Sequence, residues 1–352
     1  VGLVDVPTGR KSHSGNIPLI GGLSIYIAAF ITFWILPALQ SPGIESGMPL
    51  SAFFTAGFVL VLVGAWDDYH DLPPVARLLA QVVASLIMIY AGGVMLTDLG
   101  ALTLDGTALS LGWLAVPFTV FACLGVINAM NMCDGLDGLS ASLALIAMLG
   151  LGIANSMWGS LADQHLIGVL AACIAGFLVF NLRTLWRSKA WVFLGDAGSM
   201  LLGIALTWLA IRLSQGEARA ISPAAALWFL MLPIYDAVSM MLRRLLLRRS
   251  PFRADREHLH HIFLLAGFSV GETVALMCSV AMAGVVVGLG AVWLEIPDLL
   301  VATAFLGGGL LYYWAVRRAW RLMRFLRRSI CRRNNKERRD NGFDTSQLEE
   351  TG

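Results

Sequence analysis

Long runs of apolar residues dominate the chain, and short polar segments separate them. Ten of these runs come close to or reach the roughly 20 residues that a membrane-crossing helix needs. Apolar residues occupy all sides of each run rather than every second position, which favours α-helices over the strands of a β-barrel. The predicted spans are residues 18–39, 50–66, 75–96, 113–130, 139–158, 166–182, 195–213, 223–241, 270–293 and 299–316.

The composition agrees with this pattern. Of the 352 residues, 57% are hydrophobic and 14% are charged, and the mean hydropathy is +0.73. Soluble domains carry about 25% charged residues, so a water-soluble globule is excluded, as are a disordered chain and a disulfide-rich secreted domain. We therefore expect an all-α polytopic membrane protein. Residues 1–316 form its single integral-membrane domain, and residues 317–352 form a basic cytoplasmic helix and a disordered tail.

The net charge of +2 conceals a strong segregation of charge. Ten crossings place both ends of the chain on one side, and 23 of the 25 Lys and Arg residues fall on that side, leaving only Arg212 and Arg219 on the other. The positive-inside rule identifies the basic side as the cytoplasm. The arginines of the segment 317–328 follow a helical spacing, which favours a helix that binds anionic lipid headgroups over a nucleic-acid site.

Candidate catalytic carboxylates lie in the loops of this same side. Asp67 and Asp68 directly follow an apolar span, where a carboxylate is costly unless it is hydrated, paired or bound to a metal. Asp196 begins another span, where it either caps the helix or presents its carboxylate to a phosphate–metal complex. Carboxylates grouped without nearby lysines favour Mg²⁺, which uses one or two carboxylates together with substrate phosphates.

The loop 128–138 adds amides and glycines to this set. It contains two asparagines, Asn128 and Asn131, and two Asp-Gly pairs that begin at Asp134 and Asp137. A simple turn is one interpretation of the Asp-Gly pairs. The alternative is a loop whose amides hold a diphosphate or a metal and whose glycines let a ligand approach the backbone closely.

A histidine loop completes the set. His258, His260 and His261 are too close in sequence for the usual zinc pair at positions i and i+4 of a helix. Because Arg253 and Arg256 precede them, phosphate binding or proton donation is the favoured function, with a solvated basic loop as the simpler alternative.

Together these loops predict Mg²⁺-assisted phosphoryl transfer between a soluble diphosphate and a lipid. A transporter would place charged residues at mid-membrane depth, whereas most charges here lie at one surface. A CDP-alcohol phosphotransferase and an intramembrane prenyltransferase are further alternatives, but the Asp-rich motifs that each requires are absent or faint.

The order of the motifs resembles one known family, the polyprenyl-phosphate N-acetylhexosamine-1-phosphate transferases of the MraY/WecA/TagO group. The last motif is similar to the WecA/TagO type. The family has eleven helices, so the resemblance implies that the first one precedes this chain. The matching segments are Val1-Gly-Leu-Val-Asp5, Arg10-Lys11-Ser-His13, Pro18-Leu-Ile-Gly21-Gly22, Asp67-Asp68, Asn128-x-x-Asn131-x-x-Asp134-Gly-Leu-Asp137-Gly-Leu, Phe193-Leu-Gly-Asp196-Ala-Gly-Ser and Asp255-Arg256-Glu257-His258-Leu-His260-His261.

The resemblance implies attack by undecaprenyl phosphate on the β-phosphorus of a UDP-N-acetylhexosamine, with release of UMP. UDP-GlcNAc is the leading donor, and UDP-linked FucNAc, QuiNAc or MurNAc-pentapeptide are the alternatives. The enzyme would lie in the bacterial inner membrane with its active site toward the cytoplasm. The product would begin synthesis of a cell-envelope polysaccharide such as O-antigen or teichoic acid. The resemblance is also compatible with a homodimer.

The same resemblance assigns roles to individual residues. The catalytic residues would be Asp67, Asp68, Asp196 and His260. The ligands of Mg²⁺, with Mn²⁺ as an alternative, would be Asp196, Asn131 and Asp68, and Arg77 would pair with the Asp67-Asp68 cluster. The substrate-binding residues would be Asp5, Lys11, Arg77, Asn128, Asn131, Asp134, Gly135, Leu136, Asp137, Phe193, Arg256, His258 and His261.

Overall fold

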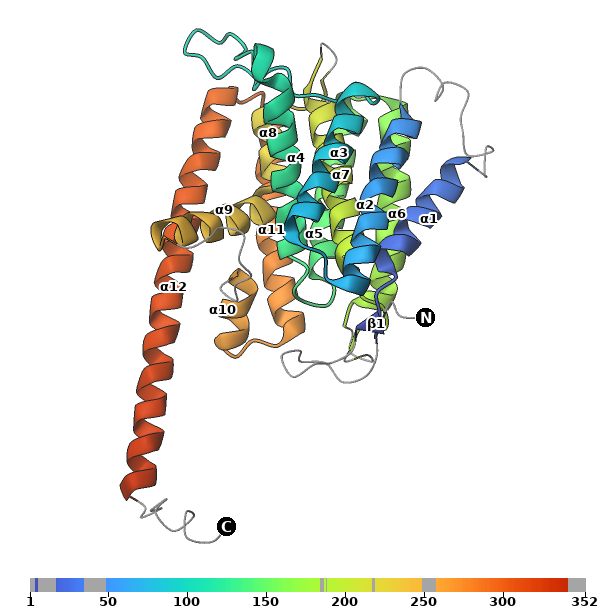
Figure 1. Cartoon of the computed structure of the whole chain (residues 1–352). Coiled ribbons are helices and arrows are strands. Elements are labelled where there is room, and N and C mark those ends of the chain that lie inside the picture. The colour runs from blue at the N-terminus through green and yellow to red at the C-terminus, as the bar shows by residue number, and fades with distance from the viewer. Residues whose placement is uncertain are drawn as a thin grey trace.

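The described part of the chain is a bundle of helices with a very short β-ribbon, as a computed structural model shows (Figure 1). The structure describes residues 4–5, 17–34, 49–183, 187, 189–216, 219–248 and 258–340. Side chains are described within these ranges except for Asp5 and residues 322–340. The strands β1 (Val4–Asp5) and β2 (Ile17–Pro18) pair antiparallel at the end of the bundle where the predicted site loops gather.

The helices follow the predicted apolar runs closely. They are α1 (Gly21–Trp34), α2 (Leu50–His70), α3 (Pro74–Tyr90), the 3₁₀ turn η2 (Gly112–Leu114), α4 (Ala115–Met132), α5 (Leu139–Trp158), α6 (Leu161–Asn181), α7 (Gly195–Ser214), α8 (Pro223–Phe229), α9 (Met231–Leu246), α10 (Leu259–Leu265), α11 (Val270–Trp293) and α12 (Asp298–Asp340).

Local sequence signals fix where several helices begin. Ser160 and Ser222 each accept a hydrogen bond from a backbone N–H in the first turn of α6 and α8. Ser269 and Glu272 form a reciprocal capping box at the start of α11. These side chains satisfy backbone donors that have no partner within the helix.

The prediction of an all-α membrane protein is confirmed. Within the described residues, seven helices are long and apolar enough to cross a membrane. Two further predicted spans form shorter apolar helices, because α1 covers 14 described residues and α3 ends at Tyr90 rather than at Leu96.

The predicted span over residues 223–241 is wrong as a single straight helix. It consists of α8 and α9, which meet at Leu230 with a bend of 85°. Pro233 lies in the first turn of α9, where its missing N–H is tolerated, but it cannot continue the hydrogen-bond ladder of α8. In Figure 1, α9 accordingly runs across the bundle instead of along it.

The predicted boundary at residue 316 does not correspond to a break in the chain. Helix α12 begins at Asp298 and continues without interruption to Asp340. The predicted basic helix is therefore the continuation of a membrane span, and it extends beyond the bundle in Figure 1. The tail predicted to be disordered, residues 341–352, lies outside the described residues.

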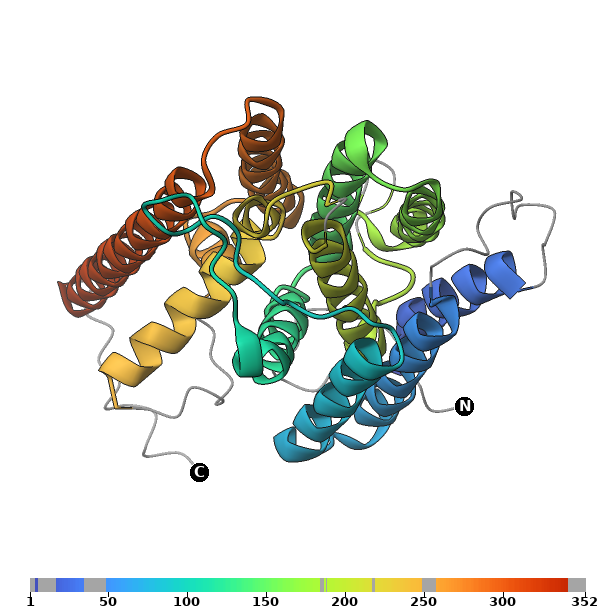
Figure 2. The same ribbon diagram turned by 90° about the horizontal axis from the view of Figure 1, so that it is seen from above.

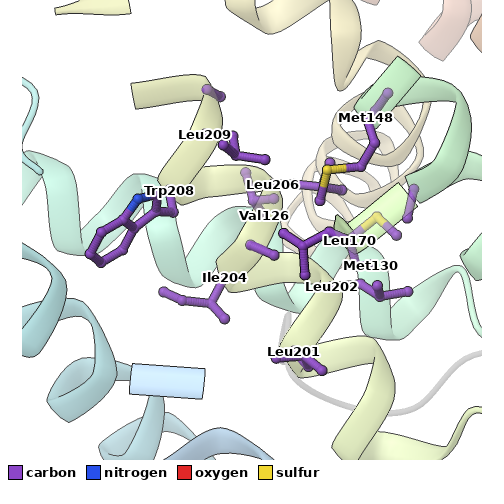
Figure 3. Packing of buried hydrophobic residues seen from close by; sticks show 14 of the residues in the cluster. Val126, Met130, Met148, Leu170, Leu201, Leu202, Ile204, Leu206, Trp208 and Leu209 are labelled. Carbon is purple, nitrogen blue, oxygen red and sulfur yellow. The ribbon is translucent and has the colours of Figure 1, made fainter. Parts of the chain in front are cut away.

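Helix α7 forms the centre of the bundle. It lies among α1, α2, α4 and α5 and packs against each of them (Figure 2). Nearly all of its side chains are buried. Leu206 and Trp208 are fully buried (Figure 3). Trp208 packs edge-on against Phe53, with 5.4 Å between ring centroids. An all-round apolar helix suits this position, because each of its faces meets another helix.

Candidate active site

Two glycines let α7 lie unusually close to its neighbours. A Cβ atom on Gly64 of α2 would collide with the backbone of Ala197, and one on Gly22 of α1 would collide with the backbone of Gly198. Residues of any other type would push these helices apart. The close crossing brings the end of α2, with its two aspartates, against the beginning of α7.

Asp68 caps α7 from the neighbouring helix. Its Oδ1 accepts a hydrogen bond from the backbone N–H of Asp196 at 2.9 Å, and its Oδ2 accepts one from Ala197 at 3.3 Å. Asp196 does not cap its own helix, so that alternative is wrong and its carboxylate is free to face the site. A carboxylate at a helix N-terminus is stabilised by the unpaired N–H groups and the helix dipole.

Asp67, Arg77 and Asp196 form an ionic cluster. The Arg77 Nη1 lies 3.0 Å from Oδ2 of Asp67 and 3.6 Å from Oδ2 of Asp196, so the predicted pairing of Arg77 is confirmed. Asp67 is buried, and its Oδ1 accepts a hydrogen bond from the backbone of Leu72 at 2.7 Å. Asn131 donates its amide hydrogens to Oδ1 of Asp196 at 2.5 Å and to Ser199 at 3.0 Å. Helices α2, α3, α4 and α7 thus meet at one point.

The chemistry of this cluster fits a hard cation. Arg77 bridges the carboxylates of Asp67 and Asp196, and Oδ2 of Asp67 is buried and accepts no hydrogen bond from the described part of the chain beside this ion pair. Within the described residues, no group of three or more His, Cys, Asp or Glu side chains has the arrangement of a metal site. Mg²⁺ does not require one, since it commonly binds through one or two carboxylates, waters and substrate phosphates.

The loop after α4 brings a further carboxylate toward this cluster. Burial raises the pKa of Asp134 well above its ordinary value, and the charges of Asp196, Asp68 and Asp137 raise it further. Crowded carboxylates of this kind are typical of a site that receives a cation or a hydrogen-bonding ligand.

The histidine loop closes on this Asp-Gly turn. His260 is 2% exposed, and a Cβ atom on Gly135 would lie only 2.6 Å from its Nε2. Burial, together with the charges of the neighbouring His261 and His258, lowers the pKa of His260 from 6.5 to about 3. His260 is therefore neutral at physiological pH in this arrangement, which makes it a hydrogen-bonding group rather than a cation for phosphate.

Three other predicted residues have structural partners. The amide of Asn128 donates to Gln81 at 2.7 Å, and Asp137 accepts from Nε of Arg183 at 2.7 Å. The backbone of Phe193 donates to Pro18 and accepts from Gly21, which fixes the segment before α7. Asn128 and Asp137 thus support the site from its edge in this structure, and a direct contact with substrate stays a prediction for each.

Some predicted residues lie wholly or partly outside the described part of the chain. Lys11 and Arg256 lie outside the described residues, and only the backbone of Asp5 is described, next to Ile17 in the β-ribbon. Leu136 is described and packs at the edge of a small apolar cluster together with Leu259 and Phe263. The loop 134–136 and the start of α10 are therefore neighbours.

Asp236 was not among the predicted site residues, and the structure places it beside the histidine loop. It lies on α9 and is 2% exposed, and it contacts both His258 and the backbone of Leu259. A carboxylate inside a predicted span was the available signal, because ionisable groups at membrane depth are costly and are commonly functional.

Comparison with known proteins agrees with this geometry. A profile of glycosyl transferase family 4 matches residues 50–214. The undecaprenyl-phosphate alpha-N-acetylglucosaminyl 1-phosphate transferase of Escherichia coli (strain K12) is 34% identical over 330 residues, which are 93% of this chain and 87% of that protein. Proteins of the same name from Salmonella typhimurium and Haemophilus influenzae are also 34% identical, over 97% and 93% of this chain and 91% and 90% of their own lengths.

The similarity to these proteins extends over nearly the whole chain, and the residues matched by the family profile include all the helices that form the ionic cluster. With its carboxylate cluster at one end of an apolar helical bundle, the chain belongs to glycosyl transferase family 4, as a polyprenyl-phosphate hexosamine-1-phosphate transferase.

Proposed function

We propose that this protein transfers N-acetylglucosamine-1-phosphate from UDP-GlcNAc to undecaprenyl phosphate and releases UMP. The observation that carries the proposal is the convergence of Asp67, Asp68 and Asp196 around Arg77 and Asn131 at one end of a lipid-embedded bundle. A lipid phosphate can reach this end from the bilayer, and a nucleotide sugar can reach it from water. The names of the similar proteins support the same donor sugar and acceptor lipid.

In this reaction an oxygen of the lipid phosphate forms a bond to the β-phosphorus of the UDP-sugar. The bond between that phosphorus and the bridging oxygen breaks, and the bridging oxygen leaves with UMP. The lipid phosphate is already an anion at neutral pH, so the demand for a strong general base is small. Positioning and charge neutralisation are the main requirements of such a transfer.

Asp67 and Arg77 meet the first of these requirements. Asp67 is held between Arg77 and the Leu72 N–H, which directs the Arg77 guanidinium toward Asp196. A guanidinium in this place can bind phosphate oxygens through two parallel hydrogen bonds. We infer that Asp67 orients Arg77 and the lipid phosphate and is not required as a strong base.

Mg²⁺, with Mn²⁺ as an alternative, is the proposed cofactor. Asp196 would hold it with help from Asn131, whose amide already orients that carboxylate, and from Asp68. When bound, the ion would neutralise charge on the diphosphate and polarise the reacting phosphorus.

The loops next to the ionic cluster would form the rest of the substrate pocket. Asp134, Gly135, Leu136 and Phe193 would hold the uridine, since Asp134 lies near the ionic cluster and keeps a proton readily. The histidine loop would cover the diphosphate and sugar from the opposite side, because His260 lies against Gly135. We place this face in the cytoplasm and the bundle in the bacterial inner membrane, because the basic part of α12 extends beyond the same end of the bundle (Figure 1) and the positive-inside rule assigns basic segments to the cytoplasm.

The test is a turnover assay with purified protein in detergent or lipid. Undecaprenyl phosphate, Mg²⁺ and each of several UDP-sugars are supplied, and UMP release is measured. We expect release with UDP-GlcNAc and its loss when EDTA is added. No release with any UDP-sugar would overturn the enzyme assignment, and release only with a UDP-FucNAc or UDP-QuiNAc type donor would overturn the choice of sugar.

Two substitutions test the site within the same assay. Asp67→Asn and Asp196→Asn should each abolish turnover, because each removes a carboxylate charge from the cluster. Asp105→Asn is the matched control, since Asp105 is an exposed aspartate in the hairpin at the other end of the bundle. Full activity in both site variants would contradict the assigned cluster.

A further inference from the structure

A buried carboxylate on the bent helix α9 connects three segments that are distant in the sequence. Asp236 Oδ2 lies 2.8 Å from Nδ1 of His258, and Oδ1 accepts hydrogen bonds from the Leu259 backbone at 3.1 Å and from the Tyr312 hydroxyl of α12 at 3.0 Å. Both Asp236 and His258 are buried. The carboxylate therefore joins α9, the start of α10 and α12.

This contact determines how the His258 ring is used. A carboxylate accepts hydrogen bonds, so Nδ1 of His258 carries the hydrogen, and Nε2 is the nitrogen left for another partner. Carboxylate–histidine pairs of this kind fix both the tautomer and the orientation of the ring. The Leu259 hydrogen bond to the same carboxylate fixes the backbone next to the ring.

The orientation of His258 is passed on to its neighbours. The rings of His258 and His260 are parallel, with 2° between their planes and 5.5 Å between centroids, and the centroid of His261 lies 4.2 Å from that of His260. His260 in turn lies against Gly135 of the Asp-Gly loop. A rotation of the His258 ring would therefore displace the stacked histidines against that loop.

We propose that Asp236 is a positioning residue for the transfer reaction: it holds His258 in the Nδ1-protonated tautomer and so aligns the histidine loop over the substrate. This inference rests on the proposed function, because the histidine loop is assigned to the diphosphate-sugar. Tyr312 supports the arrangement from α12 by donating a third hydrogen bond to the carboxylate. The bend between α8 and α9 is what carries Asp236 across the bundle to this loop.

The first experiment is a double-mutant cycle on UMP release. Asp236→Asn removes the charge and lets the amide offer a donor to Nδ1, which favours the wrong tautomer. We expect kcat to fall about 10- to 100-fold with a smaller change in KM, as is typical for partners of this kind. In a His258→Gln background the same substitution should have almost no further effect, because its route of action is already lost.

Tyr235→Phe is the matched control. Tyr235 is the preceding residue of α9, and its buried hydroxyl donates to the backbone of Phe305 rather than to the site. We expect turnover close to that of the wild type. If Asp236→Asn lowers kcat by the same factor with and without His258, its role is merely structural and the proposal is overturned. Wild-type turnover in Asp236→Asn would also overturn it.

A second measurement does not depend on turnover. In protein labelled with ¹⁵N-histidine, one ring should show a protonated Nδ1, and His258→Gln should remove that signal. Asp236→Asn should shift the ring to another tautomer, whereas Tyr235→Phe should not. An unchanged His258 signal in Asp236→Asn would refute the positioning role. If the wild type releases no UMP, the proposed function fails, and this spectrum still decides whether Asp236 sets the tautomer of His258.

Discussion

Replacing Gly64 by alanine tests whether the close crossing of α2 and α7 builds the site. Gly64 lies one helical turn before Asp67 and Asp68, and the added methyl group would collide with backbone atoms of Ala197. Backbone atoms cannot rotate away as a flexible side chain can. The two helices must therefore separate at the point where Asp68 caps α7.

The expected magnitude follows from two opposing contributions. Alanine is favoured over glycine in a helix by about 1 kcal/mol, whereas overpacking costs about 1–3 kcal/mol. Because the collision is with backbone atoms, we expect an overpacking cost in the upper part of its range. Subtracting the helix preference of alanine leaves a net loss of stability of about 1–2 kcal/mol. The effect on turnover should be larger. A shift of about 1 Å would break the hydrogen bonds of Asp68 to Asp196 and Ala197 and misplace the carboxylate, which can cost about 100-fold in kcat.

The assay compares Gly64→Ala with Gly176→Ala, a glycine of α6 at which an added methyl group meets open space. Both substitutions make the same chemical change within a helix. UMP release and thermal unfolding should show a large loss of kcat and lower stability for Gly64→Ala, and wild-type activity with equal or higher stability for Gly176→Ala. If the two variants were alike in both measurements, the close crossing would not be what positions Asp68.

Three further predictions concern charge at the site. Arg77→Met leaves Asp67 and Asp196 without their shared cation. Loss of one partner of a buried ion pair costs about 3–5 kcal/mol of stability. Because the Arg77 side chain is 30% exposed, we expect a smaller loss of about 2 kcal/mol, measured by thermal unfolding, and loss of most UMP release. Wild-type stability and turnover would contradict the ionic cluster. For His260, the folded pKa of about 3 lies below the ordinary 6.5, so the unfolded chain binds more protons and stability falls as pH drops below about 6.5. The loss of stability should reach about 2 kcal/mol at pH 5. In His260→Gln, melting temperatures measured across this pH range should not show that loss. For Asp134 the pKa is raised in the folded protein, so the free energy of unfolding declines as the pH rises above the ordinary pKa of an aspartate. Asp134→Asn should therefore have a higher melting temperature than the wild type at pH 7 in EDTA, and calorimetry should show weaker binding of UDP-GlcNAc. A lower melting temperature would refute the crowding of carboxylates around Asp134.

The apolar pattern predicted the helices because it depends on local properties of the chain. A helix in a bilayer satisfies its own backbone hydrogen bonds, so each long apolar run must be helical wherever it packs. The match is closest for residues 139–158 and 270–293, whose predicted bounds are those of α5 and α11. The pattern could not show the bend at Leu230, because the apolar character continues through both α8 and α9.

The motifs selected most residues of the candidate site because charged and amide side chains are conspicuous in so apolar a chain. They could not distinguish the role of each residue. Asp196 was a plausible cap of its own helix, but Asp68 from α2 takes that role. Asn128 and Asp137 were expected at the substrate, and the structure pairs them with Gln81 and Arg183.

The sequence alone determined that this chain is a helical membrane protein with its candidate chemistry at one face, and its motifs indicated the family. Those conclusions follow from residue type and local spacing, which the chain carries without being folded. Only the tertiary structure decided which side chains meet. The approach of α2 to α7, the ionic cluster at Arg77 and the contact of Asp236 with His258 depend on helix crossings. A crossing is set by the packing of small and large side chains from separate segments, and no single stretch of sequence contains that information.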